Sequence, residues 1–497
     1  MKSELKDGNP ILTYTYATRH GILLLNYENP KRICAYFSQL PAMAVINEVQ
    51  RQNGRDVEFE KLSEAEFQES LVALYQQKSS RDLSNTEGLG EQLNIASLSD
   101  IIPDATEVLD QDNEAPIIKL ISGVISEAIR QNASDIHFAT NEHHLTIKFR
   151  IDGTLREVAR VERRLSPLVV SRAKVMAKLD IAEKRIPQDG RISIRVGGRD
   201  VDLRVSTMPA SFGERIVMRI LDKKMGYLSL EQLGLSDDNL ARLHHALSLP
   251  HGIILATGPT GSGKSTMLYA GLSSINDGAQ NILTIEDPIE YQLEGIGQTQ
   301  VNVKAGMTFA KGLRSMLRQD PDVIMVGEIR DEETIRIAIQ ASLTGHLVLS
   351  TLHTNTAVGA ITRLEDMGVE PFLISSTLSA VIAQRLVRVL CPHCKEPYQA
   401  NSDEAALLNL DNHNHIIFKA NDNGCEECSH QGYKGRTALY EVVLIDDELR
   451  KLIHEQQPES ELIKSARKHS RSLQSDGYDK IKAGITTFEE VNRVARN

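Results

Sequence analysis

Short apolar runs alternate with helix-like segments between residues 235 and 385. The runs are almost entirely apolar, which is typical of strands buried on both faces; they are 252–257, 282–285, 323–326 and 347–350. After the first run, apolar side chains recur at helical spacing from residue 265 to 276, before Asp277-Gly278 ends the segment. Strands that alternate with helices predict a mainly parallel sheet covered by helices.

The pattern changes to period 2 in the preceding region, residues 116–222. Residues 116–132 have the spacing of an amphipathic helix, and four later segments alternate between apolar and polar positions: 145–151, 192–196, 201–205 and 216–220. Turn residues such as Asp152-Gly153 separate them. We expect an antiparallel sheet with one apolar face and one face that carries basic side chains: Lys148, Arg150, Arg195 and Arg204.

Three further regions complete the organisation. Residues 1–80 predict a small α+β module, with strands at 21–27 and 34–38 and helices at 41–52 and 63–77. Residues 81–115 are acidic and aperiodic, which indicates a flexible linker or an irregular packed segment. The C-terminal part predicts a small cysteine-containing module at 386–441 and helices over 442–497.

Length and charge narrow the class of protein. The chain has 497 residues, enough for roughly three to four domains. Its net charge of −11, 4% aromatic residues and lack of Trp argue against a nucleic-acid-binding surface. No apolar stretch approaches the roughly 18 residues of a membrane span, and the first residues lack the apolar segment of a signal peptide. We therefore expect a cytoplasmic protein that reaches any membrane through a partner.

A glycine-rich loop follows the first apolar run. Its sequence fits the P-loop pattern GxxxxGK[ST] and consists of Gly258, Pro259, Thr260, Gly261, Ser262, Gly263, Lys264 and Ser265. Because it lies between a predicted strand and a predicted helix, its backbone N–H groups can surround a phosphate chain. Lys264 is expected to bind the β- and γ-phosphates and Ser265 to ligate Mg²⁺. The sequence predicts a nucleoside triphosphate site.

Acidic residues follow two other predicted strands. Glu328 comes after the run 323–326, and Glu286, Asp287 and Glu290 come after 282–285. Magnesium and the attacking water of a P-loop enzyme need carboxylates at such positions. Taken alone, each set is equally explained by helix caps and solvated turns; beside a P-loop, we interpret both as functional.

Histidines and arginines provide further candidates. His346 and His353 flank the run 347–352, where each is either a γ-phosphate sensor or a hydrogen-bonded structural residue. Lys311, Arg314 and Arg318 have the spacing of one helical face. That face, like Arg330 and Arg363, is either solvated surface or a source of positive charge for a phosphoryl group.

Four of the five cysteines form two Cys-x2-Cys pairs. Cys391, Cys394, Cys425 and Cys428 have the spacing of a closed structural zinc site, although four reduced, unligated thiols have the same sequence. A disulfide is not expected in the cytosol. The remaining Cys34 lies in an apolar segment and is interpreted as a small buried hydrophobe.

In combination, these motifs resemble the secretion ATPase superfamily and most closely the type II secretion ATPases. The similar segments of the core are Gly258–Thr266, Thr284–Tyr291, Leu317–Asp322, Gly327–Asp331, Thr344–His346 and His353–Asn355. Ser134–His137, Gln188–Arg191 and Gly213–Arg215 resemble the family's second N-terminal domain. The resemblance covers about residues 115–490, whereas residues 1–80 match only in size and position.

The resemblance implies an α/β protein with a RecA-type P-loop core, a preceding α+β domain, a small N-terminal α+β module and a four-cysteine zinc module. It implies a homo-hexameric ATPase that uses ATP, Mg²⁺ and Zn²⁺, with nucleotide contacts extending to Thr266, Glu286 and Asp287. By motif, Arg204 and Arg219 of the second domain contact the triphosphate. Glu290 orients the attacking water and Glu328 serves Mg²⁺ through water, although these two roles are interchangeable at this level.

The resemblance also implies a place in the cell. The protein is expected beneath the inner membrane, docked through residues 1–80 to platform proteins, where it drives assembly of a pilin-like fibre for secretion. A type IV pilus assembly ATPase shares these motifs, whereas a pilus retraction ATPase lacks the cysteine module and the N-terminal extension. A nucleic-acid translocase conflicts with the acidic composition, and a non-enzymatic scaffold conflicts with the intact P-loop.

Overall fold

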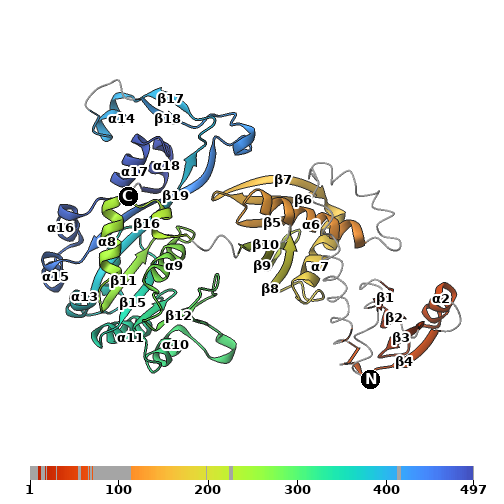
Figure 1. The fold of residues 1–497 in the computed structure, drawn as a ribbon. Helices are drawn as coiled ribbons and strands as arrows, with labels where there is room; N and C mark the ends of the chain where they lie inside the picture. The colour runs from red at the N-terminus through yellow and green to blue at the C-terminus, as the bar shows by residue number, and fades with distance from the viewer. Residues whose placement is uncertain are drawn as a thin grey trace. The chain divides into compact units, whose positions relative to one another are not determined.

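The chain forms two compact units, Met1–Lys223 and Lys224–Asn497. The computed structural model describes residues 9–12, 17, 20–28, 31–53, 57–64, 66–67, 70, 114–196, 199–222, 228–410 and 416–495 (Figure 1). The predicted linker 81–115 lies outside these residues except for 114–115. None of the helices in the described ranges is long and apolar enough to cross a membrane.

The N-terminal module contains a four-stranded sheet in the order β1-β2-β3-β4. Its elements are β1 (Asn9–Pro10), β2 (Ile22–Glu28), β3 (Lys31–Phe37), α2 (Met43–Asn53) and β4 (Val57–Lys61). Alternate residues of β2 enter two apolar clusters: Leu23 and Leu25 pack with Phe67, and Ile22 and Leu24 pack with Val45 of α2. Burial on both faces explains why β2 is apolar without alternation.

A capping box forms at the start of the helix predicted over 63–77, where the backbone N–H groups of Ser63 and Glu66 each bond to the other residue's side chain, at 3.2 and 3.3 Å. The predicted end of that helix near Gln77 lies outside the described residues. Cys34 is buried, in agreement with its interpretation as a small hydrophobe.

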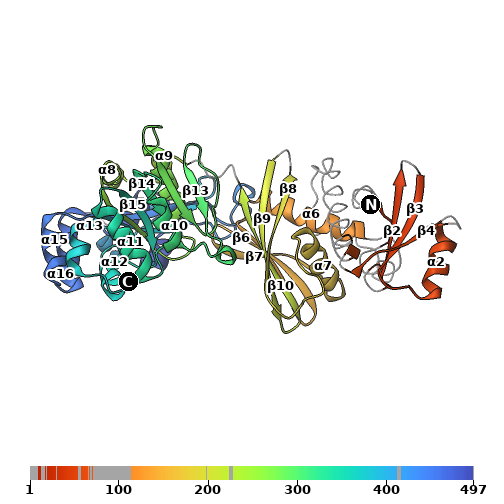
Figure 2. The same ribbon diagram turned by 90° about the horizontal axis from the view of Figure 1, so that it is seen from below.

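The second domain is a six-stranded antiparallel sheet with two helices on one face (Figure 2). The strand order is β7-β6-β5-β10-β9-β8. Ile136, Leu203 and Met218 pack with α6 and α7, whereas basic side chains occupy the other face, as predicted. The elements are α6 (Glu114–Arg130), β5 (Asp135–Thr140), β6 (His144–Ile151), β7 (Thr154–Glu162), α7 (Ser166–Met176), β8 (Gln188–Val196), β9 (Arg199–Ala210) and β10 (Gly213–Asp222).

The second unit is built on a seven-stranded sheet in the order β13-β12-β14-β15-β11-β16-β19. All neighbouring strands are parallel except β16 and β19. The strands are β11 (Gly252–Thr257), β12 (Ile282–Glu286), β13 (Gly297–Gln300), β14 (Val323–Val326), β15 (Leu347–Leu352), β16 (Leu378–Leu390) and β19 (Tyr433–Leu444). The fold class inferred from the sequence is confirmed.

Helices cover both faces of this sheet. One apolar cluster contains residues of α8 (Asp237–Leu247) and α9 (Lys264–Ile275). The other contains residues of α10 (Phe309–Met316), α11 (Glu332–Leu343), α12 (Gly359–Asp366), α13 (Pro371–Thr377), α15 (Asp447–His454), α16 (Glu459–His469), α17 (Leu473–Lys482) and α18 (Phe488–Ala495). The C-terminal helices therefore belong to the core unit.

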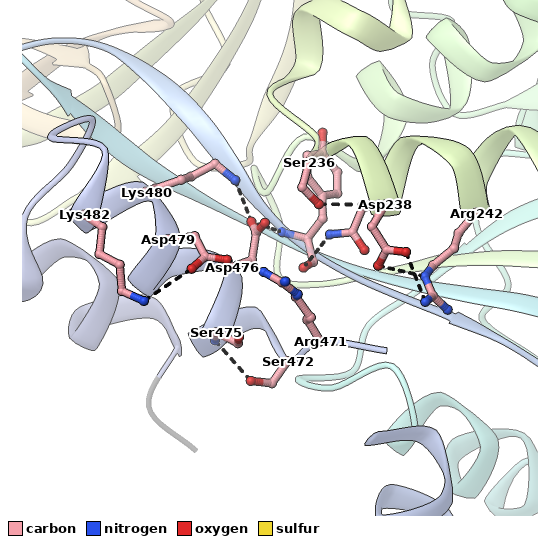
Figure 3. Close-up of polar contacts among 12 residues, drawn as sticks. Ser236, Asp238, Arg242, Arg471, Ser472, Ser475, Asp476, Asp479, Lys480 and Lys482 are labelled. Carbon is pink, nitrogen blue, oxygen red and sulfur yellow. Dashed lines mark hydrogen bonds and ion pairs between the residues drawn. The ribbon is translucent and has the colours of Figure 1, made fainter. Parts of the chain in front are cut away.

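Polar contacts also fasten α17 to the sheet (Figure 3). The buried Asp476 carboxylate accepts hydrogen bonds from the Tyr440 N–H at 3.0 Å and from Lys480 Nζ at 2.5 Å. Asn239 of α8 donates to the Tyr440 carbonyl at 3.4 Å. These contacts link α8, β19 and α17 through one residue.

The cysteine segment emerges from this sheet. β16 continues through Leu390, and β19 pairs with it from Tyr433 to Leu444. The sequence-based boundary between 385 and 386 therefore falls inside β16. Between these strands lie β17 (Glu396–Gln399), α14 (Ser402–Leu407) and β18 (Ile416–Lys419), with β17 and β18 forming a separate two-stranded sheet.

Candidate nucleotide site and metal centre

The P-loop joins the carboxyl end of β11 to the first turn of α9. Glycine is required at Gly258, because a Cβ there would approach the Gln384 carbonyl oxygen and Ser262 Oγ to 2.6 Å each. Ser262 Oγ is buried and has no hydrogen-bond partner within the described part of the chain. Thr260 and Ser265 are exposed, and Thr266 is half-buried. The loop therefore exposes Thr260 and the metal-ligand candidate Ser265.

Lys264 is buried, with 8% of its surface exposed. Its Nζ donates to the carbonyls of Gly258 and Pro259 at 2.8 and 3.1 Å. Burial lowers the pKa of Lys264 to about 8; Glu328 acts in the opposite direction and Arg385 in the same direction. Within the described ranges its hydrogen bonds go to these carbonyls, and such a buried ammonium is suited to bind an anion.

The other candidate site residues follow the carboxyl ends of four parallel strands, which form one edge of the sheet. β11, β12, β14 and β15 are parallel and in register, so the residues that follow them lie at a common carboxyl edge. Glu328 Oε2 lies 3.7 Å from His353 Nε2, and Glu328 Oε1 pairs with Arg330. The hydrogen bond with Glu328 raises the pKa of Arg330 against the effect of burial, and Asp287 adds to the rise. Glu328, His353 and Asp287 are thus brought together.

The loop after β15 is fastened to β11 beside the P-loop. Thr257 Oγ1 donates to the Thr354 carbonyl at 3.1 Å and accepts from the Thr354 N–H at 2.9 Å. His353, which precedes Thr354, is therefore held next to the end of β11.

His346 lies at the opposite edge of the sheet, where the amino ends of β11 and β15 meet. This position corrects its assignment to the phosphate site. Its carbonyl accepts the N–H of Gly252 at the start of β11, and its Nδ1 lies 2.8 Å from the Ala341 carbonyl at the end of α11. The six residues of β15 separate the two histidines by roughly 20 Å along the strand. His346 is the structural alternative considered in the sequence analysis.

Glu286, which the resemblance places among the nucleotide contacts, is a buried residue of a hydrogen-bond network. It is 4% exposed, and its two carboxylate oxygens bond to Tyr269, Thr284 and Gln298. Asp287 and Glu290, which follow it, are exposed. The exposed acids of this loop are therefore Asp287 and Glu290.

Two polar residues near the P-loop were missed by sequence reasoning. Gln384 and Arg385 lie in the mostly apolar β16 and are 2% and 7% exposed. The Arg385 guanidinium donates to the Gln384 carbonyl at 3.0 Å and to the Asn355 carbonyl at 2.7 Å. Burial lowers the pKa of Arg385, opposed by Glu441. The sequence feature that could have identified them is a Gln-Arg pair inside an apolar run.

The arginines of the second domain form a row across its polar face. Strand register places Arg150 opposite Asp135, Asp135 opposite Arg219, Arg219 opposite Arg204, and Arg204 opposite Arg191. Buried Asp135 accepts from Arg219 Nε at 3.0 Å and pairs with Arg150 Nε at 3.5 Å. Like charges opposite each other destabilise a sheet. The exposed Arg204 and Arg219 therefore form a site suited to an anion.

The basic segment of α10 is solvent-exposed. Arg314 pairs with Glu333 at 2.7 Å, while Arg318 lies beyond the end of the helix and donates to the Arg314 carbonyl at 3.0 Å. Lys311 and Arg363 are also exposed. Within the described residues, these contacts are those of a solvated surface.

The four paired cysteines converge on one point. Their Sγ atoms all lie within 4.8 Å of one another, with 3.7 Å between Cys391 and Cys425 and 3.8 Å between Cys394 and Cys428. Tetrahedral zinc with Zn–S bonds of about 2.3 Å requires about 3.8 Å between sulfurs. The thiols have the geometry of a four-coordinate metal site.

Backbone donors favour the thiolate form of Cys428. The N–H groups of Cys425, Gln431 and Gly432 point at its sulfur from 3.2, 3.4 and 3.2 Å. Burial acts to raise the pKa of Cys428, but these donors outweigh it and lower the pKa to about 6. The polypeptide is thus arranged to stabilise a metal-binding thiolate.

Family models match almost the whole chain. Residues 110–493 match the family described as Type II/IV secretion system protein. Residues 11–75 match a second family, which is described as a domain of GSPII protein E. The N-terminal module, for which sequence motifs allowed a comparison of size and position alone, is thereby related to the same group of proteins.

Individual proteins agree with the family match. Type II secretion system protein E of Pseudomonas aeruginosa is 55% identical over 487 residues, which cover 98% of this chain and 96% of the relative. Type II secretion system ATPase E of Vibrio cholerae is 52% identical over 487 residues, with the same coverage.

Solved structures support the fold. The ATPase DotB of Legionella pneumophila has a TM-score of 0.58 at 23% identity and covers 78% of this chain and 97% of its own. The pilus retraction motor PilT, solved with bound ADP, has a TM-score of 0.52 at 28% identity and covers 75% of this chain and 96% of its own.

The full-length identity favours type II secretion over the pilus assembly alternative. A chain with an intact P-loop, strand-end acids at the same edge and this identity is an ATPase. It belongs to the type II/IV secretion system protein family, as a type II secretion ATPase.

Proposed function

We propose that this chain hydrolyses ATP at the carboxyl edge of the core sheet and that the energy drives pseudopilus assembly and protein export through a type II secretion system. The observation that carries the proposal is the meeting of the P-loop, Asp287, Glu328 and His353 at that edge. No other described edge of the sheet combines a buried lysine with carboxylates and a glycine-rich loop.

The P-loop residues bind the triphosphate. The Lys264 ammonium exchanges its two carbonyl contacts for phosphate oxygens, which resolves its unfavourable burial. The backbone N–H groups from Gly258 to Thr266 surround the phosphates, and the exposed Ser265 hydroxyl holds the metal. Magnesium held there would supply positive charge against the negative charge that develops on the phosphates.

Glu290 and Glu328 have separate roles in hydrolysis. Glu290 is exposed and orients the attacking water, whereas Glu328 serves the metal through water and is held by Arg330 and His353. His353 beside Glu328 reports the presence of the γ-phosphate. Arg204 and Arg219 of the second domain supply positive charge to the triphosphate, since their opposed positions favour an anion between them.

The assembled protein is a homo-hexamer on the cytoplasmic face of the inner membrane. Its N-terminal module, which matches the GSPII protein E family model over residues 11–75, docks on platform proteins of the secretion system. Zinc in the four-cysteine site would be structural, because the four thiols would fill its coordination positions. Nucleic acid is not a partner, given the net charge of −11.

Two substitutions test the assignment of the acids. Glu290→Gln and Glu328→Gln should each bind a fluorescent ATP analogue and lower kcat by roughly 10²-fold or more. Magnesium titration separates them, since only Glu328→Gln should raise the metal concentration needed for half-maximal activity. Glu294→Gln, an exposed acid in the same segment, is the matched control. Wild-type turnover in both site variants would remove the acids from the mechanism.

A further inference from the structure

Tyr269 lies between the P-loop helix and the loop that carries Glu290. It is on the second turn of α9 and 1% exposed. The edge of its ring packs against Tyr291, with 4.6 Å between centroids and an interplanar angle of 78°. Its phenol thus reaches from the helix that begins at Lys264 to the segment that follows β12.

The phenol contacts both ends of the acid loop. Its hydroxyl donates to Glu286 Oε2, at the end of β12, and accepts a long hydrogen bond of 3.4 Å from the Glu290 N–H. Burial, and after it the Glu286 charge, raises the pKa of Tyr269, so the hydroxyl keeps its proton. One oxygen therefore fixes the positions before and after Asp287, Pro288 and Ile289.

The same buried carboxylate organises the residues beyond Glu290. Glu286 Oε1 accepts from Thr284 Oγ1 at 2.6 Å and from Gln298 Nε2 at 3.1 Å. Gln298 also donates to the Tyr291 carbonyl at 3.1 Å and accepts from the Leu293 N–H at 2.7 Å. The Glu290 backbone is thus held from both sides, while its side chain remains exposed.

We propose that Tyr269 is a positioning residue for hydrolysis, which fixes the Glu290 backbone to α9 so that the water-orienting acid and the phosphate-binding loop keep one geometry. The inference rests on the role proposed for Glu290. Tyr269 acts through Glu290, whose backbone N–H it contacts.

A tyrosine with a purely structural role would stabilise the fold through the packing of its ring. The test therefore removes only the hydroxyl oxygen of Tyr269 and keeps the ring. Tyr269→Phe should lower kcat by roughly 10- to 100-fold, in line with the effect of about 1 Å of misplacement. Its KM for ATP and its affinity for a fluorescent ADP analogue should stay within about threefold of wild type, because the P-loop is unchanged.

The matched control is Tyr433→Phe. Tyr433 is a buried tyrosine of the same unit whose hydroxyl lies 3.1 Å from Thr487 Oγ1, far along the chain from the P-loop. This variant should keep wild-type kcat and KM. If Tyr269→Phe does not fold in a thermal melt, Tyr269→Phe/Glu286→Gln replaces it, because the single change removes the Tyr269 hydrogen bond from the buried Glu286 carboxylate and the amide removes that charge.

A double-mutant cycle identifies the route of the effect. In a Glu290→Gln background, Tyr269→Phe should lower kcat by less than about threefold, since the group that it positions is already absent. Independent effects that multiply would overturn the inference, as would wild-type kcat in Tyr269→Phe or an equal loss of nucleotide affinity. If Glu290→Gln alone turns over at the wild-type rate, the proposed role of Glu290 fails, and the inference fails with it. If Glu290→Gln lowers kcat and Tyr269→Phe does not, the role proposed for Glu290 stands and only the inference about Tyr269 fails.

Discussion

Replacing Lys264 by Met should abolish hydrolysis without destabilising the nucleotide-free protein. Lys264 is 8% exposed, and its pKa is lowered to about 8 from 10.5, mainly by burial. A difference of about 2.5 pKa units corresponds to about 3 kcal/mol of unfavourable free energy for the ammonium at neutral pH. Methionine keeps much of the aliphatic length and removes this charge.

The hydrogen bonds that Lys264→Met loses contribute a stabilising free energy that is smaller than, or similar to, the cost of burying the ammonium. Two hydrogen bonds, to the carbonyls of Gly258 and Pro259, disappear, each with a net contribution of about 0.5–1.5 kcal/mol. The free energy of unfolding of nucleotide-free Lys264→Met should therefore equal that of wild type or exceed it by up to about 2 kcal/mol. Thermal and urea unfolding of the full chain without nucleotide measure the difference.

The pH dependence of the free energy of unfolding tests whether the buried Lys264 ammonium destabilises the fold. Between pH 8 and 10.5, unfolded Lys264 holds a proton that the folded protein has lost. The stability of wild type should therefore rise with pH in this window relative to Lys264→Met, by up to about 3 kcal/mol. Lys304→Met, at an exposed lysine, should show no such difference from wild type. A variant clearly less stable than wild type at pH 7, or a difference independent of pH, would refute the reasoning.

The zinc site, the two histidines and the N-terminal module each provide a further test. Purified protein should contain one zinc per chain, and Cys428→Ser should lose it and unfold the segment between β16 and β19; metal-free protein with an intact fold would contradict the site, since structural zinc contributes roughly 10–16 kcal/mol in peptides. His353→Ala should lower kcat by about tenfold or more, whereas His346→Ala should lower the melting temperature and leave kcat unchanged; the reverse pattern would contradict the placement of the two histidines at opposite edges. Deleting residues 1–80 should leave basal hydrolysis intact and release the protein from the inner membrane, as measured by fractionation, and loss of hydrolysis with unchanged membrane binding would indicate a stabilising role instead.

Strands buried on both faces were predictable from the sequence. β11 and β14 have the bounds expected from their apolar runs. The edge strand β7 was not predicted, because its exposed positions interrupt the alternation. The predicted boundaries cut β16 after residue 385 and β19 after residue 441, because the pairing of these strands spans about fifty residues of sequence and no local pattern reports it.

The candidate site was predictable where a motif fixes the local geometry. The P-loop and Glu328 lie where the sequence placed them, since both follow parallel strands. His346 precedes its strand and His353 follows it, so the rule that functional residues gather at carboxyl ends already separated them. Burial of Glu286 by Tyr269 and Gln298 depends on contacts between α9, β12 and β13, which the sequence does not reveal.

Binding and hydrolysis of ATP at the carboxyl edge of the core sheet are tested most directly by a crystal structure of the full chain with Mg²⁺ and a non-hydrolysable ATP analogue. We predict Lys264 Nζ about 3 Å from a β- or γ-phosphate oxygen, no longer on the Gly258 and Pro259 carbonyls, and Ser265 Oγ on the metal. A nucleotide bound elsewhere, or a Lys264 that keeps both carbonyl contacts beside the bound analogue, would contradict this placement.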